Sequence, residues 1–176
     1  MALSLLLGGA RSGKSALALR RARASGEQVV FVVTGSPSDR EMAARIERHR
    51  AERAGFHWTT VEAPVALEES IAGCPAGACV VVDCLSLWVA NLLERGGDEA
   101  EILQRAVAAG RSAAAREAPT IAVSNEVGMG VVPAHRSGRH YRDALGRVNA
   151  AWAEVAADVA LVVAGRALRL EAGDEG

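Results

Sequence analysis

The segment Gly8–Ser15 combines glycines, a lysine and a serine at a spacing suited to phosphate chemistry. It reads GGARSGKS and fits the pattern G-x-x-x-x-G-K-[ST], between a predicted strand and a predicted helix. Such a turn allows backbone N–H groups to point at phosphate oxygens, and the helix N-terminus adds about half a positive charge. We interpret the segment as a phosphate-binding loop; the alternative is a chance glycine turn before a helix.

The positive charge in this loop comes from Lys14, the only lysine among 20 Lys and Arg residues. Its ammonium is a compact charge on a thin stem and can reach between two phosphates, whereas the planar fork of arginine is too wide for the same gap. The adjacent hydroxyl of Ser15 is a candidate Mg²⁺ ligand. The loop residues predicted to bind nucleotide are Gly8, Gly9, Ala10, Arg11, Ser12, Gly13, Lys14 and Ser15.

A second Mg²⁺ ligand is expected from Asp83. It follows the apolar run CVVV, which places it at the carboxyl end of a predicted buried strand, where nucleotide-binding sheets carry an acidic residue. The alternative is an aspartate that caps the following helix. We favour the metal role and predict a site for a nucleoside triphosphate. The reaction stays open, because kinases, GTPases and nucleic-acid motors share these features.

The stretch Arg40–Arg53 places a histidine among arginines. On a predicted helix, Arg45, His49 and Arg53 share one face at four-residue spacing. Nearby cations disfavour the protonated imidazole, so His49 is expected to stay neutral and nucleophilic near neutral pH. The same arginines can hold a polyphosphate. From composition alone, a solvated charged face is the slightly favoured interpretation.

The elements around these residues alternate between apolar strands and helices. Strands are predicted at 3–7, 28–36, 78–84, 120–124 and 158–165, with 166–170 as an additional edge strand. Helices are predicted at 14–24, 39–54, 85–95, 99–116 and 137–156. Continuous Val, Leu and Ile runs indicate strands buried on both faces, and their alternation with helices indicates a parallel sheet. The sequence predicts an α/β fold in one domain, 1–170, with 171–176 as a frayed tail.

Composition excludes several classes of function. Of the 176 residues, 50% are hydrophobic and 3% aromatic, so the core is expected to consist of Ala, Val and Leu. The net charge of −1 gives no general attraction to nucleic acid or anionic membranes. No apolar run approaches the roughly 20 residues of a membrane span. The odd number of cysteines, Cys74, Cys79 and Cys84, predicts reduced thiols in a cytoplasmic protein.

A resemblance to one known family rests on five segments that occur in order over nearly the whole chain. They are GGARSGKS, DREMAARIERHR, HWTTVEAP, VVVDCLSLWVANLL and SNEVGMGVVPAHRSGRHYRDALGRVNAAWAEVAADV. With these segments the chain resembles the bifunctional adenosylcobinamide kinase / adenosylcobinamide-phosphate guanylyltransferase family of cobalamin biosynthesis. The resemblance implies a P-loop NTPase fold with a RecA-like sheet, and a homotrimer.

The resemblance also implies two reactions. The first phosphorylates the aminopropanol hydroxyl of adenosylcobinamide with ATP or GTP. In the second, a histidine that corresponds to His49 attacks the α-phosphorus of GTP, releases pyrophosphate and passes GMP to adenosylcobinamide phosphate, giving adenosylcobinamide-GDP. Two alternatives remain: a family member with only one activity, or a RecA-like nucleic-acid-dependent ATPase. The sequence shows no aromatic-lined basic groove for nucleic acid.

Further contacts are implied residue by residue. The nucleotide contacts implied outside the loop are Thr34, Gly35, Ser36, Arg50, Ala51, Glu52, Arg53, Glu62 and Asp83. Ser15 and Asp83 are the implied ligands of Mg²⁺, which accompanies the nucleotide. Asn125 and Glu126 either face phosphate or Mg²⁺ or brace their own glycine-rich loop. The arginines of 136–142 meet a corrinoid phosphate, contact a neighbouring subunit, or are solvated.

Overall fold

One seven-stranded sheet forms the centre of the protein. The computed structural model describes residues 3–26, 28–35, 47, 56 and 58–173. The strands follow the spatial order β3-β2-β4-β5-β1-β6-β7. They are β1 (Leu3–Gly8), β2 (Val29–Val33), β3 (Thr59–Glu62), β4 (Cys79–Asp83), β5 (Thr120–Asn125), β6 (Asp158–Val163) and β7 (Arg166–Leu170). Every neighbouring pair is parallel except the antiparallel hairpin of β6 and β7, so the predicted mostly parallel sheet is confirmed.

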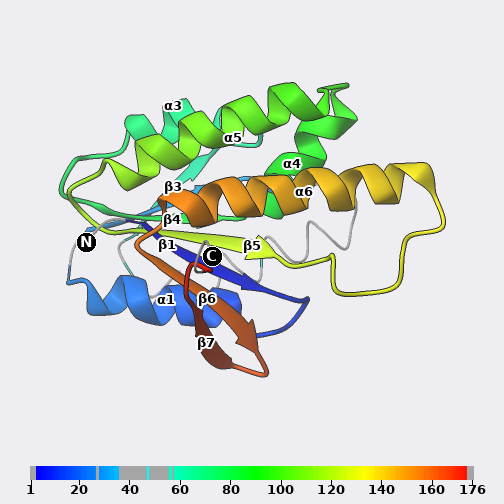
Figure 1. Cartoon of the computed structure of the whole chain (residues 1–176). Coiled ribbons are helices and arrows are strands. Elements are labelled where there is room, and N and C mark those ends of the chain that lie inside the picture. Colours follow the sequence, from blue (N-terminus) through cyan, green and yellow to red (C-terminus); the bar gives the residue numbers. More distant parts are fainter. Residues whose placement is uncertain (1–2, 27, 36–46, 48–55, 57, 174–176) are drawn as a thin grey trace.

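Helices cover both faces of this sheet (Figure 1). One face carries α1 (Lys14–Ala24). The other carries α3 (Leu67–Ala72), α4 (Leu85–Glu94), α5 (Glu99–Ala114) and α6 (Arg136–Val155). The parallel strands all end at one edge, so the loops that follow β1, β2, β4 and β5 meet there. In open α/β sheets this carboxyl edge is where ligands bind.

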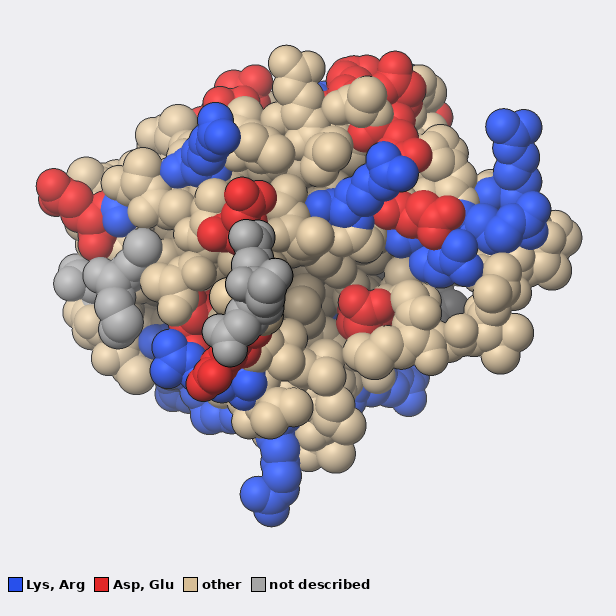
Figure 2. All heavy atoms as spheres, viewed as in Figure 1, with Lys and Arg blue, Asp and Glu red and all other residues tan. Residues whose placement is uncertain are grey.

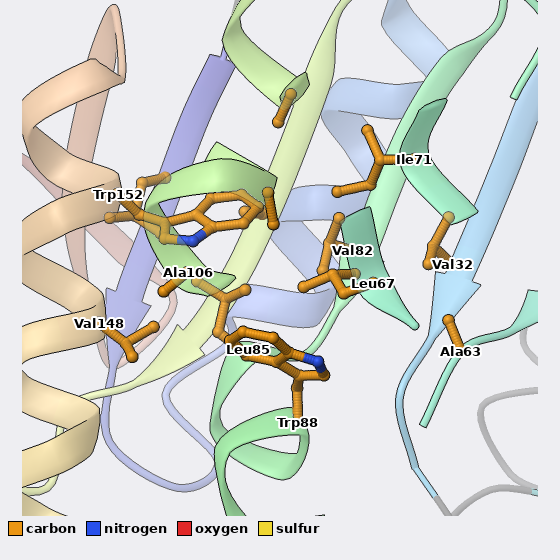
Figure 3. Close-up of a cluster of buried hydrophobic side chains, with 14 of the residues drawn as sticks. Val32, Ala63, Leu67, Ile71, Val82, Leu85, Trp88, Ala106, Val148 and Trp152 are labelled. Atoms are coloured by element: carbon orange, nitrogen blue, oxygen red, sulfur yellow. The ribbon is translucent and has the colours of Figure 1, made fainter. Parts of the chain in front are cut away.

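The alternation of side chains along each strand builds a hydrophobic core on both faces. Leu5 points into the larger cluster, under α3 to α6, whereas Leu6 points into the smaller cluster under α1. Two buried tryptophans, Trp88 and Trp152, are the largest side chains of the larger cluster, which otherwise consists mainly of Leu, Val and Ala (Figure 3). The indole N–H of Trp88 donates to the carbonyl of Val65 at 2.9 Å. This packing fixes the helices, and with them the strand ends that they contact.

The predicted helices and strands agree with the structure to within two residues at each end, except that the strand predicted at 28–36 ends at Val33. Two elements were not predicted. β3 has four mostly exposed residues and no continuous apolar run, and α3 has six residues, too few to show a helical repeat. The helix predicted at 39–54 lies outside the described residues apart from Glu47, which is helical. None of the helices in the described part of the chain is long and apolar enough to traverse a bilayer.

Candidate nucleotide-binding site

The loop Gly8–Ser15 connects β1 to α1 at the carboxyl edge of the sheet. Gly13 is the N-cap residue of α1 and has a φ of 98°, a left-handed conformation that glycine adopts without strain. Arg11 also has a positive φ, 56°, and its side chain is exposed. The two left-handed residues curl the backbone just before the helix, as the sequence pattern requires.

Several polar groups of this loop lack hydrogen-bond partners. Among the described residues, the backbone N–H groups of Gly13, Ser15 and Ala16 donate to no oxygen. The hydroxyl oxygen of Ser12 is buried and likewise has no partner in the described part of the chain. A buried hydroxyl without a partner is costly, and a phosphate oxygen would satisfy it together with the free N–H groups of the helix start. The residues present therefore fit a phosphate group.

Lys14 brings its charge inside the loop. Its side chain is only 6% exposed, and its Nζ donates to the carbonyl of Gly9 at 2.8 Å. Because the ammonium already lies over the loop, a bound phosphate chain would meet it without a large change of the lysine stem. This position supports the role predicted for the only lysine of the sequence.

The hairpin of β6 and β7 supports the loop from the side. The N–H of Gly165, in the hairpin turn, donates to the carbonyl of Ser12 at 2.8 Å. A Cβ placed on Gly8 would lie 2.5 Å from the carbonyl oxygen of Val162 and 2.7 Å from Oγ of Ser12. Sequence reasoning missed this support, because no local pattern connects the loop to a turn at the far end of the chain.

Replacing Gly8 with alanine is expected to lower the free energy of unfolding by about 1–3 kcal/mol, because the new methyl group forces backbone shifts in the loop or in β6. Gly9→Ala is the matched control, since a Cβ at Gly9 meets nothing within 4 Å. It should change stability by at most about 0.5 kcal/mol. Urea unfolding of the two variants checks this. Equal unfolding free energies would show that the contact with Val162 does not constrain Gly8.

Asp83 ends β4 at the same edge as the loop. Only β5 lies between β4 and β1, so about 10 Å separates the two strand backbones. The N-cap residue of α4 is Cys84, and its side chain makes no cap hydrogen bond. The N-cap position of α4 thus falls one residue after Asp83. Asp83 and the loop therefore lie at the same edge of the sheet, two strands apart.

The oxygen atoms of Ser15 and Asp83 are the ligand type that Mg²⁺ prefers. Both residues are half-buried. In the described ranges, no group of three or more His, Cys, Asp or Glu residues could hold a metal ion by itself. This donor set suits a Mg²⁺ that arrives with nucleotide phosphates better than a resident metal.

Glu62 lies further from the loop than Asp83 does. Glu62, Val33 and Asp83 stand side by side on β3, β2 and β4. β3 is four strands away from β1, a distance of roughly 19 Å between their backbones. The sheet therefore brings Asp83 near the loop, whereas the exposed Glu62 could meet only a distant part of an extended nucleotide.

The segment after β2 carries the remaining predicted contacts. Thr34 is fully buried and its hydroxyl is hydrogen-bonded to the backbone of Cys84, whereas Gly35 is half-buried. The other predicted site residues of this segment lie outside the described part of the chain: Ser36, His49, Arg50, Ala51, Glu52 and Arg53.

The described residues that follow this segment, Phe56 and Trp58, lie on the face of the sheet that α1 covers. The ring of Trp58 stacks on that of Phe31, with 5.3 Å between centroids, and on Phe56, with 4.5 Å. The guanidinium of Arg23, on α1, lies 4.1 Å from the centre of the Phe56 ring. The described ends of the segment thus lie at the carboxyl edge of β2 and beside α1.

The glycine-rich loop after β5 is joined to the phosphate-binding loop. The N–H of Glu126 donates to the carbonyl of Gly8 at 3.0 Å, and a carboxylate oxygen of Glu126 accepts from the N–H of Gly128 at 2.5 Å. On α6, the side chain of Asn149 donates to the carbonyl of Asn125 at 3.1 Å. These contacts favour the bracing interpretation of Glu126 over a direct metal contact.

Positive side chains gather where α6 begins (Figure 2). Arg139 does not extend into solvent there: its guanidinium donates to the carbonyls of Pro133 and Ala134 at 2.9 and 2.7 Å. Arg142 pairs with the adjacent Asp143 at 2.8 Å. Arg139 therefore also braces a loop, and Arg136 is the exposed arginine of this helix start.

Two titratable groups near the core have shifted pKa values. Burial raises the pKa of the Cys74 thiol, and Arg116 offsets part of that effect. Burial and the neighbouring Cys84 raise the pKa of Tyr141 to about 12, although a hydrogen bond with the side chain of Ser86 acts in the opposite direction. Both groups therefore stay protonated at neutral pH and supply no nucleophile. The three cysteines are buried and form no disulfide within the described residues.

A family model and curated relatives match nearly the whole chain. A family model described as cobinamide kinase / cobinamide phosphate guanyltransferase matches residues 4–170. The bifunctional adenosylcobalamin biosynthesis protein CobP of Pseudomonas aeruginosa is 42% identical over 175 residues, which cover 95% of this chain and 96% of that protein. The bifunctional adenosylcobalamin biosynthesis protein CobU of Escherichia coli is 40% identical over 183 residues, which cover 95% of this chain and 98% of that protein.

Solved structures of more distant proteins share the fold. A protein from Pyrococcus horikoshii OT3 has a TM-score of 0.57 at 12% identity, with 96% of this chain and 85% of that chain covered. The RadB recombinase has a TM-score of 0.52 at 19% identity, with 91% and 73% covered. At these identities the likeness concerns the fold alone, and it is a P-loop NTPase fold.

Proposed function

The chain belongs to the cobinamide kinase / cobinamide phosphate guanyltransferase family, and from this premise we propose that it performs two successive reactions on one corrinoid. In the first, it transfers the γ-phosphate of ATP or GTP to the aminopropanol hydroxyl of adenosylcobinamide. In the second, it transfers GMP from GTP to the new phosphate, giving adenosylcobinamide-GDP and pyrophosphate. The observation that carries the proposal is the phosphate-binding loop with the buried Lys14, in a chain that matches the family over nearly its full length.

In both reactions the loop Gly8–Ser15 has the same task. Its N–H groups and Lys14 bind the phosphate chain and stabilise the charge that develops on it, which is how most catalysis of phosphoryl transfer arises. Ser15 and Asp83 would hold a Mg²⁺ ion, which neutralises phosphate charge when it is bound. Thr34, Gly35, Ser36 and Glu62 belong to the proposed nucleotide surroundings, together with Arg50, Ala51, Glu52 and Arg53.

The second reaction needs a nucleophile, which we assign to His49. A neutral imidazole nitrogen attacks the α-phosphorus of GTP; a P–N bond forms, the bond to the β-phosphate oxygen breaks, and pyrophosphate leaves. A phosphate oxygen of the corrinoid then attacks the same phosphorus, and the P–N bond breaks. Covalent catalysis of this kind replaces one difficult step by two easier ones. The assignment is supported by the resemblance and by the arginines around His49 in the sequence.

A homotrimer in the cytoplasm is also part of the proposal. The outer hairpin exposes Val163, Leu168 and Leu170, which a subunit contact would cover. The absence of disulfides among the buried thiols of the described residues is consistent with a reducing compartment. The likeness to RadB is a likeness of fold and does not favour nucleic acid as a partner.

The proposed function is tested by following the label of two GTP preparations. With Mg²⁺ and GTP labelled at the α-phosphate, the denatured chain is expected to carry label that acid removes and alkali does not, as for a phosphoramidate. With GTP or ATP labelled at the γ-phosphate, label should appear on adenosylcobinamide. Absence of both signals would contradict the proposal. Label on the corrinoid without label on the chain would instead indicate a member that acts only as a kinase.

A further inference from the structure

The carboxyl ends of β2 and β4 are joined through the side chain of Thr34. Its buried hydroxyl donates to the backbone carbonyl of Cys84 at 2.6 Å and accepts from the N–H of the same residue at 2.9 Å. The N–H of Thr34 donates to the carbonyl of Asp83 at 3.0 Å. Three hydrogen bonds therefore hold the backbone at Asp83 against the end of β2.

The side chain of Asn91, on helix α4, connects the end of β3 to the end of β2. Its side-chain Nδ2 donates to the carbonyl of Thr34 at 2.8 Å and to the carbonyl of Pro64, just after β3, at 2.9 Å. The NH₂ group of asparagine has two donors, and both are used here. One amide thus bridges the ends of two parallel strands, and Thr34 connects it to the end of a third.

We propose that Asn91 is a positioning residue for the nucleotide site, whose amide keeps the ends of β2 and β3 in place beside Asp83. The inference rests on the proposed function, in which Asp83 holds the nucleotide-bound Mg²⁺. The Asn91 amide contacts the carbonyls of Thr34 and Pro64 and acts on Asp83 through Thr34. The exact position of Asp83 matters, because a shift of about 1 Å at a reacting centre can lower a rate about 100-fold.

The competing explanation is that Asn91 contributes only to stability. Two substitutions at Asn91, together with a control at another site, separate the explanations. Aspartate keeps the shape of asparagine but has no donor, so its carboxylate would face two carbonyl oxygens and both hydrogen bonds would be lost. Alanine removes the amide without adding charge. If both variants behave alike, the lost hydrogen bonds and not a new charge near Asp83 are responsible.

Arg116 offers a matched control at the other end of the sheet. Its guanidinium also donates to backbone carbonyls, those of Ile71, Cys74, Pro75 and Ala78. Ala78 precedes β4, so this cluster lies at the amino end of the strand that Asp83 ends. Arg116→Gln removes bonds of the same kind without changing the carboxyl edge. It is expected to lower stability and leave kcat within about twofold of the wild type.

A second pair of variants tests the connection through Thr34. Thr34→Val keeps the shape of the side chain and loses the hydroxyl, whereas Thr34→Ser keeps the hydroxyl. If the hydroxyl positions Asp83, serine should restore most of the activity that valine loses. A side chain that only fills space would give the opposite order, because valine fills the site better than serine.

The test measures kcat of γ-phosphate transfer against Mg²⁺ concentration, together with amide hydrogen exchange of Cys84. Asn91→Asp and Asn91→Ala are expected to lower kcat by about 10- to 100-fold, to require more Mg²⁺, and to exchange the Cys84 amide faster than Arg116→Gln does. All measurements are made at a temperature at which each variant is folded. An unchanged Mg²⁺ requirement, or a kcat within twofold of the wild type, would overturn the inference.

The failure of this inference can be told apart from the failure of the proposed function. A wild-type protein that transfers no phosphate would contradict the proposed function. The exchange measurement does not depend on activity: if the Cys84 amide exchanges at the same rate in Asn91→Asp and in the wild type, Asn91 does not hold this edge, and the positioning role is overturned.

Discussion

Lys14→Ala is expected to slow both γ-phosphate transfer and formation of the GMP adduct by about 100- to 1000-fold, the usual effect of removing one electrostatic contact to a transition state. Both reactions are affected because one loop binds the phosphate chain in each. The ammonium of Lys14 lies inside that loop, against the carbonyl of Gly9. The two labelling assays, run at saturating Mg²⁺ and GTP, measure the effect.

Stability should not follow activity in this variant. A buried ammonium is costly to remove from water, so its loss is not expected to lower the free energy of unfolding by more than about 1 kcal/mol. Arg20→Ala removes a positive charge from the exposed side of the same helix and serves as the control, with activity close to that of the wild type. A folded Lys14→Ala protein that retains both activities within about twofold would contradict the role of the loop.

Lys14→Arg tests the reason for the choice of lysine. The variant keeps the positive charge but replaces a compact ammonium by a planar fork. Since Lys14 is 6% exposed, the wider group has little room in the loop. A loss close to that of Lys14→Ala would show that the shape of the cation matters, whereas activity close to the wild type would show that charge alone suffices.

The parts of the site that lie within one continuous segment could be predicted from the sequence. The loop Gly8–Ser15 has its own pattern, and the buried strand before Asp83 is a run of Val residues. Both depend on local backbone preferences and on burial of adjacent side chains, which a sequence shows directly. The exposed four-residue strand β3 has neither feature, so it could not be recognised although its neighbour β2 was.

The hydrogen bonds that connect segments could not be predicted. Asn91 and Thr34 are 57 residues apart, and Thr34 and Cys84 are 50 apart. The resemblance predicts that Thr34 lines the nucleotide pocket, and the structure adds that its hydroxyl is hydrogen-bonded to the backbone of Cys84. β2 and β4 are neighbours in the sheet but not in the sequence. Only this strand order brings Thr34, after β2, close to Asp83, at the end of β4.

His49→Ala is expected to abolish the covalent GMP adduct while some transfer of γ-phosphate to adenosylcobinamide remains. The imidazole is the proposed nucleophile only in guanylyl transfer, whereas phosphoryl transfer to the corrinoid hydroxyl depends on the loop and Mg²⁺. Label from α-labelled GTP on the denatured chain measures the first reaction, and label from γ-labelled nucleotide on the corrinoid measures the second. His140→Ala, an exposed histidine on α6, is the control and should retain the adduct.

The comparison between Lys14→Ala and His49→Ala carries more weight than either variant alone. If one loop serves both reactions and one histidine serves only the second, Lys14→Ala lowers both signals and His49→Ala lowers one. Loss of both signals in a folded His49→Ala protein would mean that the segment carrying His49 also holds the nucleotide for the kinase step. An adduct that persists in His49→Ala would assign the nucleophile to another residue and leave His49 as a solvated histidine among arginines.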